Sequence, residues 1–369
     1  MNKIILNATC IGSKPDGIGI YCRNIIERII IKNTLVRYII YINEEALAMM
    51  SHLTNTDQVI VKVTPRFLSP KYGFFGHLLR FLFSNYLSLV YPRTIIFNPS
   101  QLEASINNNN QILMVHDLIP LLFNNDPILR NPIQFFFFKY ILGTAIRKSA
   151  AILAPSKHTM ALIKKEFYPN PEKMFVIPNG IDSPEKVSPL KKEENFILYV
   201  GRLSATKNIT ALINAYRKIA DKVSHKLIIA GGGDNKFLID GDPGGPGTIE
   251  YVGYVSDKKK GLLLSKASLF VFPSFYEGFG FPPLEAMAHG CPTIVSKVSS
   301  LPEICGEASL YIDPNNTDNI ANVMNKLLLN NKLQNQLIKS GYDQVKKYTW
   351  ERSAVGHVNV IDIIKSRGK

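Results

Sequence analysis

Two carboxylates, Glu277 and Glu285, stand eight positions apart within residues 272–292. Two glycines and two prolines lie between them, so one helix cannot carry both side chains. The pattern predicts a strand, a glycine loop, and then a helix with Pro282 or Pro283 at its first position. We therefore expect Glu277 on the loop and Glu285 in or near the first helical turn. Backbone N–H groups at such a helix start favour an anionic phosphate group.

Two cations and a second glycine loop belong to the same half of the chain. Arg202 and Lys207 follow the apolar run 196–200, and Gly231-Gly-Gly-Asp234 follows the run 226–230. Cations, glycine backbone and a helix start together suit a diphosphate, and carboxylates accept hydrogen bonds from sugar and ribose hydroxyl groups. The pattern predicts a nucleotide-sugar site. The alternative for Arg202 and Lys207 is surface charge on a loop.

The first half of the chain offers two further candidate positions. Gly17 and Gly19 lie in the segment 12–21, which is predicted to be a loop between a strand and a helix. They resemble part of a dinucleotide fingerprint, but Cys22 takes the place of its third glycine, so NAD is weakly supported. His116 ends the run 112–115, where ligands gather in parallel sheets. The alternative for His116 is a hydrogen-bonded loop residue.

Alternating strand and helix patterns predict α/β architecture with doubly wound parallel sheets. The charged stretch 185–194 has no periodicity and is predicted to be a linker. We expect an N-terminal Rossmann-like domain at 1–183, a second at 184–347, and a C-terminal helix at 348–369. The predicted strands are 3–6, 36–42, 59–63, 94–97, 112–115, 151–154, 175–177, 196–200, 226–230, 250–253, 269–272, 293–295 and 310–312. The predicted helices include 73–90, 132–148, 317–329 and 332–347, and Asn208 is expected to cap a helix that runs to about Ala220.

The composition is that of a globular protein, with 369 residues, 46% hydrophobic and 20% charged. The four cysteines lack the spacing of a metal site, and scattered thiols are typical of a reducing cytoplasm. The segment after Lys3 is too short for a secretory signal, and the most apolar stretch, 74–90, is interrupted by polar residues. We therefore expect a cytoplasmic protein that is soluble or peripheral to a membrane.

The formal net charge is +14, and two long stretches of the first half carry only basic charges. Residues 58–102 and 127–165 contain no acidic side chain, although both contain several lysines and arginines among many aromatics. One reading is a solvated basic surface. Another is a surface that contacts anionic lipid headgroups. A third is nucleic-acid binding, but the sequence has no zinc-finger spacing, RNP-like motif or basic recognition helix.

The pattern Glu277-x(7)-Glu285 within 272–292 resembles the signature of retaining glycosyltransferases of family 4, and 201–208 resembles their G-R-x(4)-K-N segment. Further segments occur in the order that such enzymes show: His116-Asp-Leu-Ile-Pro120, Ala154-Pro-Ser-Lys-His158, Ile177-Pro-Asn-Gly-Ile-Asp182, Ser300-Leu-Pro-Glu303 and Tyr348-Thr-Trp350. The resemblance implies a GT-B fold, with two Rossmann-like domains facing across a cleft, and no cofactor or essential metal.

Carried over to this sequence, the resemblance assigns roles residue by residue. Arg202 and Lys207 would hold the diphosphate, Glu285 the ribose, and Glu277 the donor sugar. Four backbone positions would line the sugar and phosphates: Gly278, Phe279, Gly280 and Phe281. His116 would approach the reacting carbon, and Gly17 and Gly19 would form a loop over the diphosphate.

The implied enzyme is a retaining, metal-independent hexosyltransferase in O-antigen, lipopolysaccharide, capsule or exopolysaccharide synthesis. Its partners would be a nucleoside diphosphate sugar, a lipid-linked saccharide acceptor and the anionic inner face of the cytoplasmic membrane. No nucleic acid is expected. GDP-mannose is the first donor candidate, ahead of GDP-rhamnose and UDP-sugars. The alternatives are a soluble acceptor, a catalytically inactive nucleotide-sugar-binding protein and, more distantly, an NAD-dependent reductase. The run Asp240-Gly-Asp242 resembles the metal motif of another transferase fold, and we read it as part of a turn-rich insertion.

Overall fold

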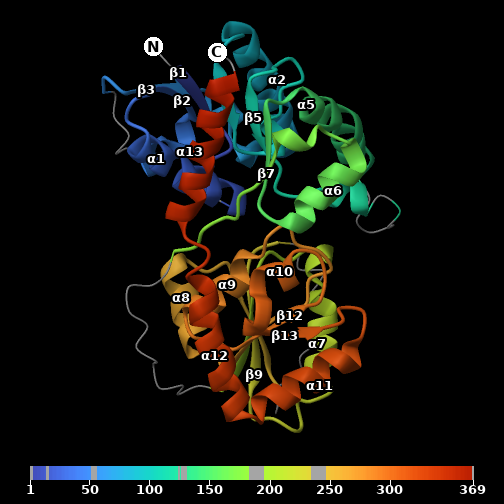
Figure 1. Cartoon of the computed structure of the whole chain (residues 1–369). Coiled ribbons are helices and arrows are strands. Elements are labelled where there is room, and N and C mark those ends of the chain that lie inside the picture. The colour runs from blue at the N-terminus through green and yellow to red at the C-terminus, as the bar shows by residue number, and fades with distance from the viewer. Residues whose placement is uncertain are drawn as a thin grey trace. The chain divides into compact units, whose positions relative to one another are not determined.

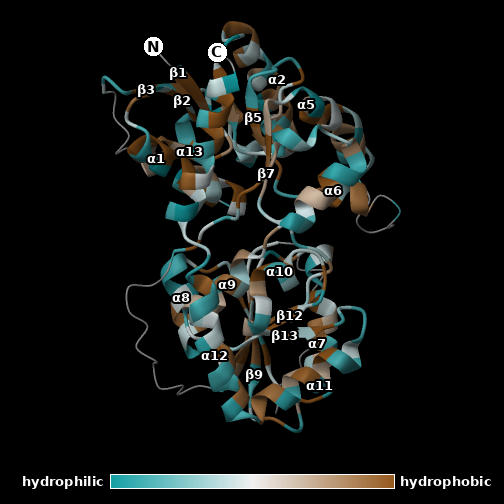
Figure 2. Cartoon of the chain, viewed as in Figure 1, coloured by the Kyte–Doolittle hydropathy of each residue, from teal (hydrophilic) through white to brown (hydrophobic). Residues whose placement is uncertain are grey.

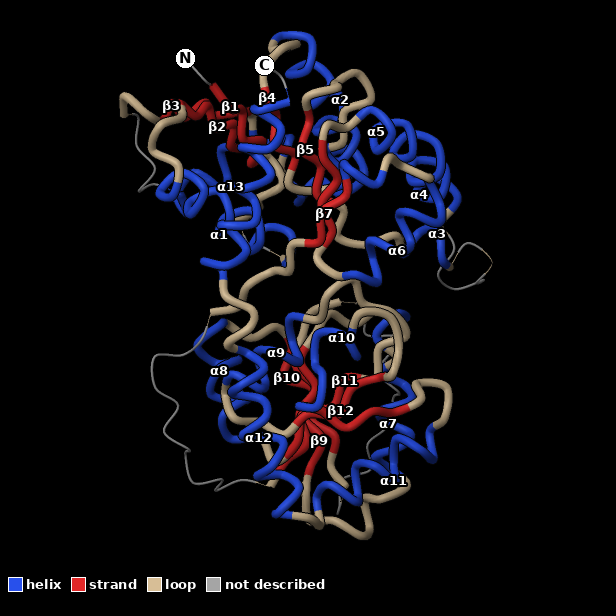
Figure 3. Tube along the Cα trace, in the orientation of Figure 1, coloured by secondary structure: helices blue, strands red, loops and turns tan. Residues whose placement is uncertain are grey.

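The computed structural model describes residues 3–13, 16–50, 56–123, 125, 131–182, 195–233 and 247–367. Its chain divides into two compact units, Met1–Gly180 with Thr349–Lys369, and Ile181–Tyr348. The predicted linker and the Asp240-Gly-Asp242 run lie outside the described residues. Each unit is a parallel sheet with helices around it (Figures 1 and 3).

The first unit has seven strands in the order β3-β2-β1-β4-β5-β6-β7, all parallel. The chain adds strands on one side of β1 and then returns to place β4 on its other side. The carboxyl ends of β1 and β4 therefore form the topological switch point of this unit. In sheet order the strands are β3 (Val59–Thr64), β2 (Arg37–Asn43), β1 (Lys3–Ala8), β4 (Ile95–Asn98), β5 (Gln111–Met114), β6 (Ala151–Ala154) and β7 (Met174–Val176).

The second unit repeats this plan with six parallel strands in the order β10-β9-β8-β11-β12-β13. Its switch point lies between β8 and β11. Because helices cover both faces of a parallel sheet, strands such as β8, β11 and β12 are buried at every position. Figure 2 shows β9 of the same sheet in brown, the colour of hydrophobic residues. The strands are β10 (Ile249–Gly253), β9 (Lys226–Ala230), β8 (Phe196–Val200), β11 (Leu269–Phe272), β12 (Thr293–Ser296) and β13 (Ser309–Ile312).

The described helices of the first unit are α1 (Gly17–Lys32), α2 (Gly73–Val90), α3 (Ile119–Leu122), α4 (Pro132–Phe136), the π-helical segment η5 (Phe137–Leu142), α5 (Gly143–Lys148), α6 (Lys157–Phe167) and α13 (Trp350–Arg367). Those of the second unit are α7 (Ile209–Arg217), α8 (Asp257–Lys266), α9 (Phe281–Ala288), α10 (Leu301–Cys305), α11 (Thr317–Leu328) and α12 (Asn331–Val345). The final helix α13 packs against α1, the first helix of the chain.

The strands predicted from the sequence are all present, with ends that differ by no more than two residues. Three local predictions were wrong. The predicted loop over 12–21 ends at Asp16, because its side chain accepts a hydrogen bond from Gly19 N at 3.0 Å and begins α1 there. Helix α9 begins at Phe281, one residue before Pro282. Asn208 is the N-cap residue of α7, but its side chain makes no capping hydrogen bond; its amide NH2 donates to the carbonyl of Pro314 at 2.7 Å.

Candidate functional site

The loops after β8 and β9 lie against each other in the second unit. Gly201 N donates to the carbonyl of Ala230 at 3.0 Å, and Leu203 N donates to the carbonyl of Gly232 at 2.8 Å. Gly231 has φ +151°, and a Cβ there would lie 1.8 Å from the carbonyl oxygen of Gly201. Only glycine fits this approach. The close contact fixes the loop that carries the exposed Arg202.

Lys207 and Glu277 form an ion pair at the switch point between β8 and β11. Lys207 ends the short 3-10 turn η7 (Ala205–Lys207) after β8, and Glu277 lies on the loop after β11. Their Nζ and Oε1 atoms are 2.5 Å apart, and the side chains are only 19% and 12% exposed. Lys207 Nζ also lies 5.5 Å from the ring centroid of Phe272, a cation–π contact. The pair therefore places a fixed cation and a fixed carboxylate where parallel α/β sheets bind ligands.

The loop that carries Glu277 is held by two consecutive serines from the segment after β12. Glu277 N donates to Ser299 Oγ at 2.9 Å. Ser300 Oγ lies 2.9 Å from the carbonyl oxygens of both Glu277 and Phe279. Ser299 adopts a left-handed conformation with φ +51°, which is uncommon for a residue with a side chain. These contacts fix the backbone from Glu277 to Phe279, which includes two of the four positions, Gly278 and Phe279, predicted to line the sugar and phosphates.

The start of α9 offers few backbone donors. Gly280 is its N-cap with φ +111°, and no side chain caps the helix. Pro282 and Pro283 have no N–H, so backbone donors at this end come only from Phe281 and the residues before it. The loop just described therefore contributes as much to this end as the helix does.

Glu285 lies in the second turn of α9 and has a partner that the sequence did not reveal. Lys260 of α8 approaches Glu285 Oε1 at 2.7 Å and Asp257 Oδ1 at 3.1 Å. Burial acts to lower the pKa of Lys260, but the two carboxylates outweigh burial and raise it. Lys260 is one of three consecutive lysines, and only the packing of α8 against α9 distinguishes it from its neighbours.

His116 follows β5 in the first unit and is buried. Its Nε2 lies 2.8 Å from the carbonyl oxygen of Pro99. A carbonyl only accepts, so Nε2 carries the proton and Nδ1 is left as an acceptor. Burial lowers the pKa of His116 to about 4, so the ring is neutral near pH 7. The predicted hydrogen-bonded loop histidine is thus present, whereas a role at a donor sugar stays a prediction.

Tyr21 packs against His116 and is itself hydrogen-bonded to a second buried histidine, His357. The Tyr21 ring stands edge-on to His116 with centroids 4.7 Å apart. The Tyr21 hydroxyl lies 2.6 Å from Nε2 of His357 in α13, and His357 Nδ1 lies 2.7 Å from the carbonyl oxygen of Ser353. His357 therefore donates from Nδ1 and accepts a hydrogen bond from the Tyr21 hydroxyl at Nε2. Burial lowers its pKa to about 4 as well.

Gly17 and Gly19 lie in the first turn of α1 rather than on a loop. The N–H of Gly19 is already engaged by Asp16, so it is not available to a phosphate while that cap is formed. Neither glycine has a positive φ among the described residues. The sequence signal at these positions is therefore explained by the start of a helix close to the β1–β4 switch point.

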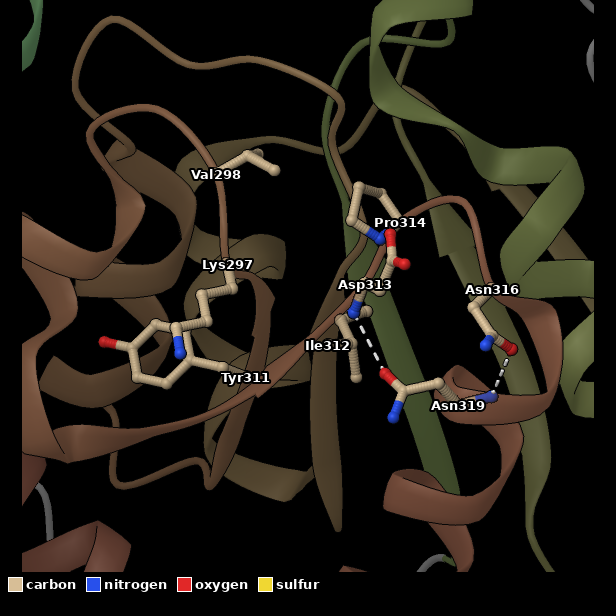
Figure 4. A pocket seen from close by; sticks show the side chains of 8 residues that line it. All are labelled: Lys297, Val298, Tyr311, Ile312, Asp313, Pro314, Asn316 and Asn319. Atoms are coloured by element: carbon tan, nitrogen blue, oxygen red, sulfur yellow. Dashed lines mark hydrogen bonds between the residues drawn. The ribbon is translucent and has the colours of Figure 1, made fainter.

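A pocket lies beside the site, at the carboxyl ends of β12 and β13 (Figure 4). Lys297 follows β12 and Asp313 follows β13. Asp313 N donates to Asn319 Oδ1, and Asn319 N donates to Asn316 Oδ1, both at 2.9 Å. The contact between Asn208 and the carbonyl of Pro314 joins this pocket to the Lys207 turn.

Within the ranges that the structure describes, no three His, Cys, Asp or Glu side chains gather as they would around a metal ion. No described helix is both long enough and apolar enough to cross a bilayer.

Fold and site together define a two-unit parallel α/β protein of the GT-B class. Residues 181–344, most of the second unit, match the family model for "Glycosyl transferases group 1". The expected fold class, with two Rossmann-like parallel-sheet units, is confirmed. A sucrose-phosphate synthase from Thermosynechococcus elongatus shares the fold, with TM-score 0.74, 17% identity and 100% of each chain covered. HepE of Anabaena in complex with UDP and glucose has TM-score 0.67 and 16% identity, and 98% of this chain and 99% of that chain are covered.

Similar sequences occur among enzymes of O-antigen synthesis. The chain is 35% identical to O-antigen chain mannosyltransferase B of Escherichia coli over 177 residues, which cover 46% of each protein. It is 30% identical to the O-antigen chain mannosyltransferase RfbU of Salmonella typhimurium over 211 residues, 56% of this chain and 57% of the relative. The matches thus span about half the length of these relatives.

Proposed function

We propose that this protein is a glycosyltransferase that moves a hexose from a nucleoside diphosphate sugar to a lipid-linked saccharide, with retention and without a metal. The Lys207–Glu277 pair at the β8–β11 switch point carries the proposal, because it joins a phosphate-binding cation to a sugar-binding carboxylate. The similarity to O-antigen mannosyltransferases supports mannose as the sugar and a surface polysaccharide as the product. HepE, solved with UDP and glucose, supports a nucleotide-linked donor.

The described side chains suit the electrostatics of this reaction. As the bond from the anomeric carbon to the phosphate oxygen breaks, negative charge grows on the leaving diphosphate. Arg202, Lys207 and the start of α9 would stabilise that charge. Because Glu277 pairs with Lys207, a donor phosphate that binds this lysine would replace one anionic partner by another.

We propose a same-face path, because no second carboxylate is assigned as nucleophile. The acceptor hydroxyl would attack the anomeric carbon from the side that the diphosphate leaves, and its proton would pass to the leaving phosphate oxygen. Neutral His116 is not suited to act as a general acid near pH 7, since its Nε2–H is directed at the carbonyl of Pro99. Its Nδ1 would instead accept a hydrogen bond from a sugar hydroxyl group.

We place the enzyme in the cytoplasm, peripheral to the inner face of the membrane. The four cysteines are all buried free thiols, in keeping with a reducing compartment. The stretches 58–102 and 131–165 contain no acidic residue, which suits an anionic lipid surface.

A panel of nucleotide sugars tests the donor. A ligand at about 100 times its Kd stabilises the native state by roughly 2.7 kcal/mol, which is visible as a rise in Tm. We expect GDP-mannose to give the largest rise, ahead of GDP-rhamnose and UDP-sugars. Transfer of labelled sugar into a lipid extract, with the anomeric configuration read by NMR, then tests acceptor and stereochemistry. Stabilisation by no nucleotide sugar would refute the proposal. Loss of transfer with chelator would refute metal independence, and labelling of water-soluble glycosides alone would favour a soluble acceptor.

A further inference from the structure

Helix α2 buries a mostly polar face and exposes an apolar one, the opposite of a usual amphipathic helix. Its buried face carries Gly76, Arg80, Ser84, Leu87 and Ser88, of which only Leu87 is a large hydrophobic residue. Its solvent face carries Phe75, Leu78, Leu82, Tyr86 and Leu89, each between 43% and 70% exposed. The spacing of three and four residues places these five side chains on one stripe of the helix.

The polar side of α2 is fully used inside the unit. Arg80 pairs with the buried Glu103 at 2.6 Å and donates to the carbonyl of Leu68 at 2.8 Å. Ser84 accepts from Asn7 at 2.8 Å, and Ser88 donates to Ser105 at the same distance. These contacts fix the rotation of α2, so its apolar stripe cannot turn inward without breaking them.

A second exposed stripe lies on the adjacent helical segment. Ile133, Phe136 and Tyr140 of α4 and η5 are each 57–60% exposed and lie three and four residues apart. The Phe136 and Tyr140 rings are in contact, with centroids 5.1 Å apart. Phe81 of α2 meets Phe137 of η5 edge-on at 5.7 Å, so α2 and η5 are neighbours. The exposed apolar side chains of α2 and of the neighbouring segment α4–η5 together form what we call the apolar face.

The charges near these elements indicate what kind of partner covers the apolar face. The segments that contribute it contain no acidic residue between 58 and 102 or between 131 and 165. Exposed cations stand beside it in the chain: Arg66 on the turn η2 (Arg66–Leu68), which packs on α2, and Arg147 and Lys148 at the end of α5. Leucines and aromatics flanked by cations match the apolar interior and anionic headgroups of a bilayer surface.

We infer that the apolar face inserts into the headgroup and acyl boundary of an anionic bilayer. This inference rests on the proposed transfer to a lipid-linked acceptor and identifies the surface by which the enzyme reaches it. Aromatic and leucine side chains would supply the insertion, and the neighbouring arginines and lysines would contact lipid phosphates. A second copy of the chain is the competing occupant.

Vesicle flotation with the full chain tests the inference. The probes are vesicles of phosphatidylcholine alone and of phosphatidylcholine mixed with phosphatidylglycerol. The variant L82Q/Y86Q removes two central side chains of the apolar face without changing charge. The variant I31Q/L35Q makes the same chemical change at two exposed apolar residues of the same unit, outside the face. Tm measured with and without the best nucleotide sugar confirms that each variant is folded.

We expect wild type to prefer the mixed vesicles, L82Q/Y86Q to bind them at least about tenfold more weakly, and I31Q/L35Q to bind like wild type. Equal binding by both variants would overturn the inference. So would a wild-type dimer that ignores vesicles and becomes monomeric in L82Q/Y86Q. A wild type that is stabilised by a nucleotide sugar but ignores vesicles would refute the inference alone. Vesicle binding without any nucleotide-sugar stabilisation would refute the proposed function alone.

Discussion

Lys207 and Glu277 form the partly buried ion pair on which the proposed site depends. Both residues were predicted from their types and their positions after apolar runs. Their ion pair was not predicted, because they are seventy positions apart and meet only when β8 and β11 become neighbours in the sheet. Lys260 was missed for the same reason, since its contact with Glu285 depends on the packing of α8 on α9.

The substitution Glu277→Gln keeps the shape of the side chain but removes its charge. We expect transfer to fall by roughly 10- to 100-fold, because a hydrogen bond to a charged group is worth about 1.5–3 kcal/mol. Stabilisation by the nucleotide sugar should persist, since Arg202 and Lys207 remain. The assay is initial-rate transfer beside the thermal measurement.

Glu250→Gln is the matched control for this experiment, because Glu250 is also paired with a lysine, Lys226 at 3.1 Å, but is well exposed on β10. It should leave transfer unchanged. Full transfer by Glu277→Gln would remove Glu277 from the site.

The strands were predictable because each is a short apolar run bounded by turn residues, and parallel strands are buried on both faces. Side-chain capping was less predictable. Asp16 starts α1 within what resembled a glycine loop, and Asn208 precedes α7 without a side-chain capping bond, while its amide NH2 donates to the carbonyl of Pro314. Likewise, the apolar pattern of α2 predicted a helix but not which side faces inward, because Arg80 is buried by a partner distant in sequence. Local sequence records propensity, whereas these outcomes depend on tertiary contacts.

The contact between the loops after β8 and β9 makes an element-level prediction. Gly231→Ala would force a Cβ to 1.8 Å from the carbonyl oxygen of Gly201 at a positive φ, so one of the two loops must move. We expect a loss of about 1–3 kcal/mol in stability and weaker nucleotide-sugar binding, since the moved loop carries Arg202. Gly232→Ala is the adjacent control, because its Cβ would meet nothing within 4 Å. Thermal unfolding with and without donor measures both effects, and equal behaviour of the two variants would contradict the prediction.

For the molecule as a whole, the buried histidines are unevenly divided between the two units. Among the described histidines, the three whose pKa is lowered to about 4 all lie in the first unit: His77, His116 and His357. Burial is the main cause in each case. An unfolded histidine has a pKa of about 6.5, so unfolding takes up protons between about pH 6.5 and pH 4. The stability of this unit should therefore fall as the pH falls through that window, and stay constant above it.

Trp350 makes this prediction measurable. It is the single tryptophan of the chain, it is buried, and it begins α13 of the first unit. Denaturant unfolding followed by its fluorescence at several pH values gives the number of protons taken up. Between pH 6.5 and 4, we expect the free energy of unfolding to fall by up to roughly 3 kcal/mol for each of the buried His116 and His357 rings, and by less for His77. His357→Gln should lower the number of protons taken up on unfolding by about one between pH 6.5 and 4. Unfolding near pH 7 and 8 serves as the control, because the histidine rings are then largely neutral in the folded and the unfolded state. An unchanged uptake in His357→Gln would show that this ring is already protonated in the folded unit.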